Sequence, residues 1–317
     1  MDLIYTNIRR FDQGVLSAYA FDLSYGASEN DFEVTIGVNE ATLDPCAFVY
    51  MEGTEYGGMI DGLKASTNSE TITYMGRTWH GILNGKVIQP DTGKDYLVVS
   101  GDANEVLSFV LDRLDVPTFA AAAELSGIYI SSYQFPRYCK AYDGIKAMLA
   151  AFGAKLKIAW HNRHVVLSAE PIVDYTDSPV DGDIASFSVE RHTLKVSHLI
   201  CLGKGDLAER EVIHLYDHGD GGIGDFKLAN GMFEIVEIYE NSNSEDLRSD
   251  GIAKFTELLN TDKSEISIPE IEGLTYDIGD IVGATERKTG ISVAAPVTQK
   301  IVKIINGVVS TEYKTGG

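Results

Sequence analysis

The chain has 317 residues, 44% of them hydrophobic, which is enough apolar material for two or three domains of ordinary size. Its net charge of −21, from 47 acidic and 26 basic residues, argues against specific binding to nucleic acid, because the phosphate backbone repels such a surface. No apolar run is long enough to cross a bilayer, and the N-terminal MDLIYTNIRR lacks the apolar core of a signal peptide, so we expect no membrane segment and synthesis in a cytoplasm.

The first 95 residues have the pattern of strands and tight turns. In DFEVTIG (31–37) apolar and polar residues alternate, which predicts a half-buried strand. Residues 46–66 contain two apolar runs joined at a charged turn, and ETITYMGRTWHG (70–81) adds a strand after a polar turn. We expect residues 1–95 to form a β-barrel domain.

The middle of the chain changes to the period of a helix. Residues 100–115 place apolar side chains on one helical face, and Asp102 followed by Glu105 predicts a cap at its start. The HNRH turn (161–164) lies between two strand-like runs and predicts a hairpin. A second helix follows the i, i+3, i+4, i+7 rule at four positions: Ile145, Met148, Leu149 and Phe152. Residues 96–178 therefore read as a small α/β insert.

Strand-like segments return from about residue 183. A helix over about 244–260 interrupts them, with Ser244 as its N-cap. The chain closes on KIVKIINGVVSTEYKTG (300–316), in which Asn-Gly between two β-branched runs predicts a type I′ hairpin. We expect residues 179–317 to form a second β-barrel domain that carries the inserted helix.

The two β-rich regions repeat one order of turns and strands. Residues 44–76 run turn, short strand, charged turn, strand, long strand, Asn-containing turn and strand, and residues 279–316 repeat that order. Residue identity is slight, so chance similarity between two meanders is the alternative to a duplication. The predicted class is α+β, mainly β, with two similar β-barrel domains flanking the α/β insert. Three chains with two such modules each would present six around an axis.

Two stretches have residue types found at functional sites. HLYDHGDGGIGD (214–225) combines His, Asp and Gly as metal-binding loops do, but its spacing fits neither an EF-hand nor a zinc motif, and a flexible loop has the same composition. In GRTWHG (76–81), Arg77 and Trp79 are types enriched in protein interfaces, with local packing as the alternative. Neither stretch decides a function alone.

Motifs of known catalytic sites are absent from the sequence. There is no nucleophile elbow, Walker loop, dinucleotide fingerprint or HExxH. Because 47 carboxylates produce close pairs by accident, no general acid and base can be chosen. We therefore predict no catalytic residue, no cofactor, no metal site and no enzymatic activity.

Three segments, in this order, carry a resemblance that covers essentially the whole chain. They are EGTEYGGMIDGLKASTNSETITYMGRTWHGILNGKVIQP (52–90), YQFPRYCKAYDGIKAMLAAFGAKLKI (133–158) and YDIGDIVGATERKTGISVAAPVTQKIVKIINGVVSTEYKTG (276–316). Together they resemble the baseplate hub proteins of long-tailed (siphovirus-type) phages and prophages of Gram-positive bacteria. Larger members of that family carry a C-terminal cell-wall lysin.

The resemblance implies a structural hub at the tail tip of the virion. Such a hub is a homotrimer whose six barrels form a pseudo-sixfold ring, a gated channel for DNA ejection. Its partners are the distal tail protein, the tail tube protein and the tape measure protein. An acidic lumen would let DNA slide without sticking. Enzymatic relatives continue beyond the hub, whereas this chain stops at Gly317, so we expect any lysin or receptor-binding protein on another chain.

Candidate residues for contacts between chains were chosen by residue type and by their place near turns. In the first barrel they are Tyr56, Tyr74, Arg77 and Trp79, and in the second Tyr276, Arg287 and Tyr313. Two other functions stay open. A metal-dependent cell-wall hydrolase would use the 214–225 loop, and a host carbohydrate- or receptor-binding module would use exposed aromatic side chains.

Overall fold

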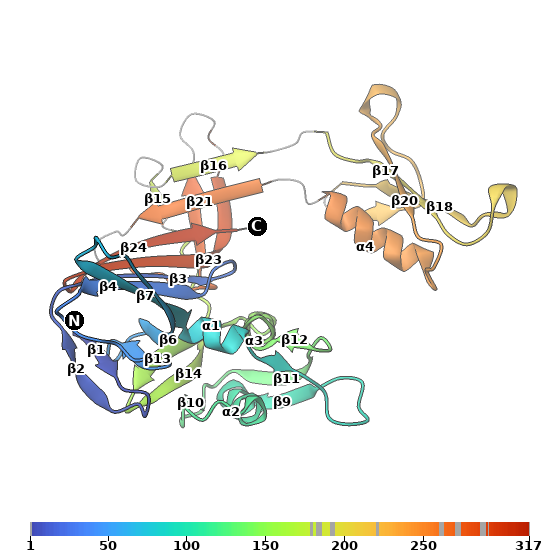
Figure 1. The fold of residues 1–317 in the computed structure, drawn as a ribbon. Coiled ribbons are helices and arrows are strands. Elements are labelled where there is room, and N and C mark those ends of the chain that lie inside the picture. The colour runs from blue at the N-terminus through green and yellow to red at the C-terminus, as the bar shows by residue number, and fades with distance from the viewer. Residues whose placement is uncertain are drawn as a thin grey trace. The chain divides into compact units, whose positions relative to one another are not determined.

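The computed structural model describes residues 2–177, 180–181, 186–190, 194–219, 222–259, 263–269, 274–285, 290 and 292–316. They form two compact units, Met1–Phe187 with Glu265–Gly317, and Ser188–Ser264. The protein is mainly β, with a large curled antiparallel sheet, several small sheets and short helices (Figure 1), which confirms the mainly β character, while the two β-barrel domains stay a prediction. The division into three domains at residues 95 and 178 stays a prediction.

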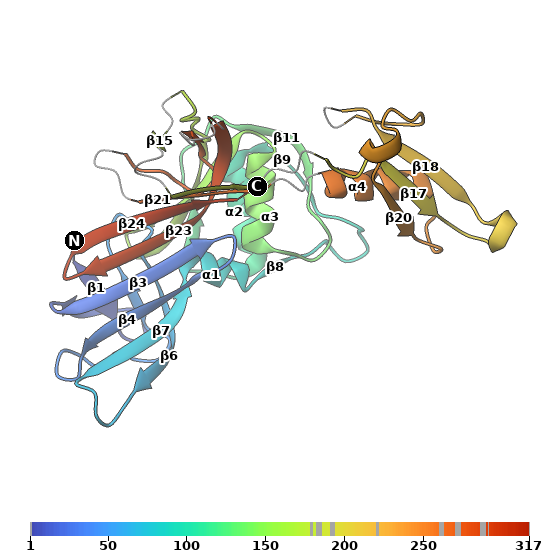
Figure 2. The same ribbon diagram turned by 90° about the horizontal axis from the view of Figure 1, so that it is seen from above.

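The large sheet has the strand order β16-β21-β24-β23-β3-β4-β7-β6-β5-β1-β2, and β22 pairs with β15 and with β23. Figures 1 and 2 show β24, β23, β3 and β4 side by side. The strands are β1 Leu3–Thr6, β2 Asp12–Leu16, β3 Tyr19–Gly26, β4 Asp31–Gly37, β5 Phe48–Tyr50, β6 Gly57–Ala65, β7 Thr71–Thr78, β15 Val180–Asp181, β16 Ser186–Glu190, β21 Lys263–Pro269, β22 Ile281–Thr285, β23 Ser292–Ile305 and β24 Val308–Thr315.

The predicted strand over 31–37 is β4, and its alternating apolar residues all face the core. Phe32, Val34 and Ile36 are at most 2% exposed, and they pack with the inward residues of β3. Residues two apart lie on one face of a strand, so the alternation in the sequence was sufficient to predict which side is buried.

Both β-rich regions form three-stranded antiparallel meanders. β5, β6 and β7 pair in sequence order, as do β22, β23 and β24. In each region a single strand, β6 or β23, stands where a strand and a long strand were predicted, and the charged turn at 286–289 lies outside the described residues. The two meanders are also linked within one sheet, because β23 pairs with β3 over seven residues, from Gln299 opposite Gly26 to Ile305 opposite Ala20.

The closing hairpin is present and its turn is bound to the first half of the chain. Asn306 and Gly307 both have left-handed backbone conformations, with φ of 48° and 85°, as a type I′ turn requires. The Asn306 side-chain oxygen accepts a hydrogen bond from Tyr19 N at 2.9 Å, and Asn306 N donates to Tyr19 O at 3.0 Å. The last turn thus docks on the first residue of β3.

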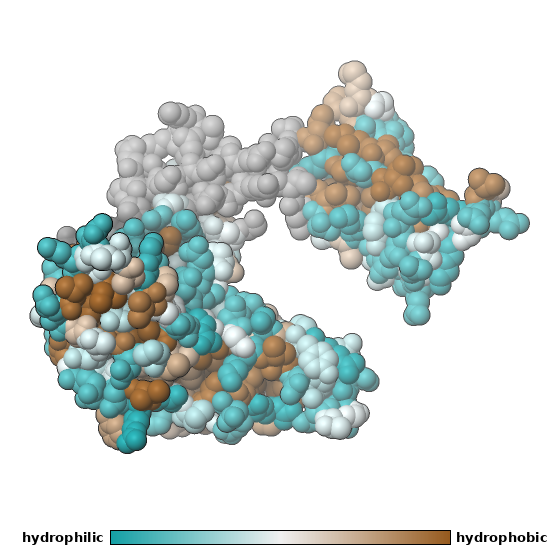
Figure 3. Space-filling view, viewed as in Figure 1, coloured by the Kyte–Doolittle hydropathy of each residue, from teal (hydrophilic) through white to brown (hydrophobic). Residues whose placement is uncertain are grey.

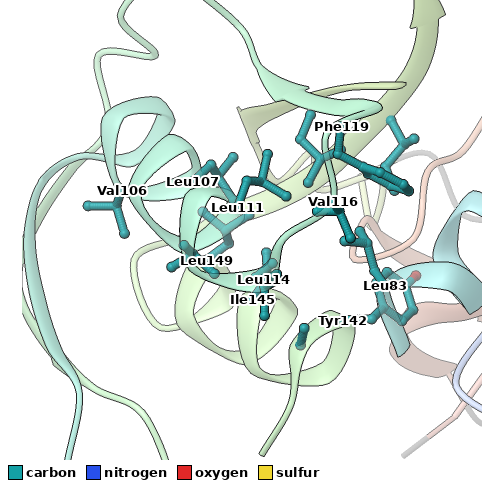
Figure 4. Packing of buried hydrophobic residues seen from close by; sticks show 14 of the residues in the cluster. Leu83, Val106, Leu107, Leu111, Leu114, Val116, Phe119, Tyr142, Ile145 and Leu149 are labelled. Atoms are coloured by element: carbon teal, nitrogen blue, oxygen red, sulfur yellow. The ribbon is translucent and has the colours of Figure 1, made fainter. Parts of the chain in front are cut away.

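The middle of the chain packs helices on a small sheet. The helices are α1 Trp79–Asn84, α2 Ala103–Leu114 and α3 Ala141–Ala150, and the strands are β8 Val87–Ile88, β9 Val98–Asp102, β10 Phe119–Ala121, β11 Tyr129–Gln134, β12 Cys139–Lys140, β13 Ala154–His161 and β14 His164–Pro171. Asp102 caps α2 as predicted, accepting from Asn104 N at 2.9 Å. Figure 4 shows the apolar faces of α2 and α3 meeting in one core. The predicted HNRH hairpin is β13–β14, with Asn162 and Arg163 left-handed.

The unit Ser188–Ser264 has its own small core. Its sheet has the order β19-β18-β17-β20, and α4 covers one face through Leu247 and Phe255. The elements are β17 His198–Leu202, the 3-10 turn Leu207–Glu209, β18 Val212–Asp217, β19 Ile223–Gly224, the 3-10 turn Gly231–Phe233, β20 Val236–Glu240 and α4 Leu247–Leu259. No helix in the described part of the chain has the length and apolarity to cross a membrane.

The predicted helix over 244–260 is α4, but its predicted cap is wrong. Asp246 directly precedes the helix and accepts a hydrogen bond from Ser249 N at 3.0 Å. Ser244 instead donates to the Asp250 carboxylate at 2.5 Å. Both residue types are good N-caps, so residue type alone did not separate them.

We expect Gly307→Ala to lower the free energy of unfolding by about 1–2 kcal/mol, because an L-residue with a Cβ is strained in the left-handed conformation. Gly37→Ala is the matched control, since Gly37 ends β4 without a positive φ and a Cβ there meets no atom within 4 Å. Urea unfolding of both variants measures the difference. Equal stabilities would contradict the assigned turn.

Candidate assembly surfaces and the buried charge network

Trp79, predicted as an interface anchor, begins α1 and is 0% exposed. Thr78 caps this helix, accepting from Gly81 N at 3.3 Å, and so fixes where the indole points. The Trp79 ring stacks on Trp160 of β13 at 5.2 Å between ring centres, and Phe48 of β5 meets it edge-on at 5.2 Å. Within the chain, Trp79 therefore joins the large sheet to the α/β part.

A buried ion pair links β23 to the loop between β5 and β6. The Lys300 ammonium lies 2.6 Å from the Glu55 carboxylate, and the Lys300 side chain is 3% exposed. Burial alone would lower the pKa of Lys300, but the Glu55 carboxylate raises it above its ordinary value. Burial likewise opposes ionisation of Glu55, yet the Lys300 ammonium lowers its pKa below the ordinary value. Both groups are therefore charged at neutral pH.

Three of the predicted tyrosines gather around this ion pair. The rings of Tyr56 and Tyr313 lie 6.0 and 5.6 Å from the Lys300 ammonium, close enough for cation–π attraction. Tyr276 meets Tyr313 edge-on at 5.2 Å between ring centres. Tyr276 and Tyr313 are each 2% exposed, so in the single chain they pack internally. The structure thus brings Tyr56, from the N-terminal β-rich region, together with Tyr276 and Tyr313 from the C-terminal one.

His80 lies beside the same pair, between two aromatic rings. It stacks on Tyr25 at 4.3 Å, meets Tyr142 edge-on at 5.3 Å, and its Nε2 lies 3.9 Å from the Glu55 carboxylate. Burial lowers the pKa of His80 to about 4 and outweighs the attraction of Glu55 for a proton. The imidazole is therefore neutral at pH 7.

A second buried ion-pair cluster links β13 to the turn before β22. Lys155 lies 2.8 Å from Asp280 and 3.0 Å from Asp277, and Lys157 lies 2.8 Å from Asp277. Burial opposes the charge on Asp277, but the two lysines lower the pKa of its carboxyl. Asp280 is 1% exposed, and it also accepts from Val173 N at 2.9 Å. The α/β part and the C-terminal strands are thereby held together.

The other predicted interface residues have separate positions. Arg77 lies on the outer face of β7 and forms a bidentate pair with Asp61, at 2.6 and 2.9 Å. Tyr74 is 2% exposed, and its hydroxyl accepts from Leu43 N at 3.3 Å. Arg287 lies outside the described residues. The assignment of the seven residues to contacts between chains stays a prediction, and of the six that the structure describes, Arg77 and Tyr56 are partly exposed.

The 214–225 loop is tied down by contacts inside its own unit. His214 Nδ1 lies 2.8 Å from His198 Nε2, and His218 Nε2 lies 2.9 Å from the Phe226 carbonyl. Asp225 pairs with Arg248 at 2.7 Å. Asp220 lies outside the described residues. Among the residues that the structure does describe, no three His, Cys, Asp or Glu side chains are placed to hold a metal ion.

The sheet of the 188–264 unit has an uncovered apolar face opposite α4. Val236 and Ile238 of β20 are 44% and 64% exposed, and Val212 of β18 is 45% exposed. The segment that leads into β20 adds further exposed side chains, namely Phe226, Leu228, Met232 and Phe233. Figure 3 shows hydrophobic residues gathered on this unit. Apolar surface concentrated in this way is typical of a protein–protein contact.

Comparison with solved structures identifies the fold. A prophage tail protein, gp18 from Listeria monocytogenes, aligns with a TM-score of 0.56 at 14% identity over 100% of this chain and 94% of that one. This is the fold of phage tail and baseplate proteins. A chain of the phage P2 baseplate in its activated conformation with Ca aligns with a TM-score of 0.56 at 10% identity, over 100% and 99% of the two chains.

A third tail protein with this fold comes from prophage MuSo2 of Shewanella oneidensis. It is the 43 kDa tail protein, and it aligns with a TM-score of 0.54 at 10% identity over 99% of this chain and 98% of that one. By sequence, no protein-family model matches the chain, and no curated protein shows significant similarity. The tail-protein fold is therefore recognised through the arrangement of the backbone.

We expect His80→Phe to remove a pH dependence of stability. In the folded wild type the pKa of His80 is about 4, below its ordinary value of 6.5. The stabilisation of the folded state by the neutral His80 ring is therefore complete above pH 6.5 and is lost as the pH falls towards 4. The unfolding free energy of the wild type should fall by about 3 kcal/mol more than that of His80→Phe over this window. The exposed His164→Phe is the control, and parallel pH profiles of all three proteins would contradict the buried neutral imidazole.

Lys300→Met should cost about 3–5 kcal/mol of unfolding free energy, because it leaves the Glu55 charge buried without its partner. The double variant Lys300→Met/Glu55→Met removes both charges and should regain more than half of that loss. Arg77→Met, which breaks the more exposed pair with Asp61, should cost only about 0–1 kcal/mol. Denaturant titrations compare the variants, and additive losses in the double variant would argue against the ion pair.

Proposed function

We propose that the chain is a non-enzymatic structural hub at the tip of a phage or prophage tail, and so a component of the virion. The observation that carries this proposal is the full-length match in fold to tail and baseplate chains, which covers 99–100% of this chain. Because the match covers the whole length of the chain and not one module, it supports a position in a phage tail like that of the matched chains.

The repeated meander supports assembly as a homotrimer. β5–β7 and β22–β24 have the same antiparallel order, which supports two related modules in one chain. We propose that these modules are the cores of two similar β-barrel domains, at 1–95 and 179–317, flanking the insert at 96–178. Three chains would then place six modules in a pseudo-sixfold ring.

The charge of the chain supports a channel function. With a net charge of −21, a ring of copies would present acidic surface, and an acidic lumen repels the phosphate backbone so that DNA passes without sticking. We propose that this ring is a gated channel for DNA ejection. The distal tail protein and the tail tube protein would bind it, the tape measure protein would pass through it, and a lysin or receptor-binding protein would be a separate chain.

The test is the native mass of the full chain, alone and with the distal tail protein of the same phage. We expect a species of three times 34.6 kDa, either alone or in the complex. A chain that stays monomeric in both conditions would overturn the hub proposal. Clearing of bacterial cell walls by the purified chain, in a zymogram with a lysozyme control, would overturn its non-enzymatic part.

A further inference from the structure

A small pocket in the first unit combines apolar walls with cationic side chains. Its volume is about 270 Å3, and its walls include Phe48 and Phe119, which are 2% and 8% exposed, together with Met59 and Ile82. Apolar walls of this kind suit an apolar side chain.

The charges at the pocket are positive although the chain as a whole is strongly acidic. Arg10, Arg77 and Lys86 line it, with Asp115 as its one acidic residue. Arg77 is engaged by Asp61 at 2.6 Å. Within the described part of the chain, neither Arg10 nor Lys86 has a carboxylate partner. Two cations are therefore available to an incoming acidic group.

The backbone holds Arg10 in place at the pocket. Arg10 has a left-handed φ of 67°, which for a residue with a Cβ costs about 1–2 kcal/mol. The Asn7 side chain fixes this turn by accepting from Arg9 N at 2.9 Å and Phe11 N at 3.1 Å. The Arg10 guanidinium lies 4.7 Å from the centre of the Phe48 ring and donates to the Thr118 hydroxyl. Its remaining N–H groups can bind a carboxylate without further ordering.

A complementary knob lies on the other unit, between β17 and β18. The 3-10 turn Leu207–Glu209, yellow in Figures 1 and 2, lies at the tip of this connection. Leu207 is 95% exposed and has a left-handed φ of 52°. Asp206 and Glu209 flank it, and neither carboxylate has an ion-pair partner among the described residues. The turn thus presents one apolar side chain between two carboxylates.

We propose that the pocket of one copy receives Leu207 of a second copy, with Asp206 and Glu209 pairing with Arg10 and Lys86. This inference rests on the proposed function, in which several copies assemble. The match is of two kinds, because an apolar side chain meets apolar walls and two carboxylates meet two cations. Such a contact joins different surfaces of the two copies and is therefore heterologous, the kind that builds a ring.

Zero-length cross-linking tests the contact directly. Equal amounts of ¹⁴N- and ¹⁵N-labelled full chain are assembled, alone or with the distal tail protein, and treated with a carbodiimide that couples an amine to a carboxylate. We expect Lys86 coupled to Asp206 or Glu209 in mixed-isotope peptide pairs. If every cross-linked pair of peptides carries a single isotope, the 207–209 turn binds the pocket of its own chain. If Lys86 couples only to other carboxylates, a different segment occupies the pocket. Either result overturns the proposal.

Charge-swap variants give the energetic test. Lys86→Glu should weaken assembly at least about tenfold, and Lys86→Glu/Glu209→Lys should restore it. Lys94→Glu is the control, since Lys94 is exposed and lies outside the pocket. If Lys86→Glu does not fold, Lys86→Gln replaces it in the same assembly measurement. If the wild type assembles and Lys86→Glu assembles equally well, this inference fails while the hub proposal stands. If the wild type stays monomeric with and without its partner, both fail.

Discussion

The pairing of β23 with β3, together with the buried Lys300–Glu55 ion pair, joins the two ends of the chain in one unit. The paired residues are separated by more than 270 positions in the sequence, for example Gln299 and Gly26. Closing so long a loop costs entropy that only the completed sheet and its core repay, so the first β region depends on the last one. Inside the chain, this pairing also covers strand edges that would otherwise invite aggregation.

Buried charge is used in this protein to join separate parts of the chain. Lys300 reaches Glu55 from the C-terminal hairpin, and Lys155 reaches Asp280 from the α/β part. Such pairs add little net stability relative to well-packed apolar side chains, but a wrong register would leave their charges buried and unpaired. Their effect is therefore to penalise alternative pairings of the strands.

The two units expose surfaces of different kinds. The first unit presents its cations at a small apolar pocket, whereas the 188–264 unit presents an uncovered apolar sheet face and a strained, exposed Leu207. Arg10 and Leu207 both have left-handed backbone conformations, which cost a residue with a Cβ about 1–2 kcal/mol.

The sequence by itself determined the local elements, including β4, α2, α3 and the closing hairpin, because each depends on side chains within a few residues of one another. It did not separate Asp246 from Ser244 as the cap of α4, since both types cap equally well. The tertiary structure alone decided that the two meanders share one sheet and that Tyr56, Tyr276 and Tyr313 gather near Lys300. Contacts between residues hundreds of positions apart depend on the register of strand pairing and on burial. The local periodicity of the sequence does not encode either of them.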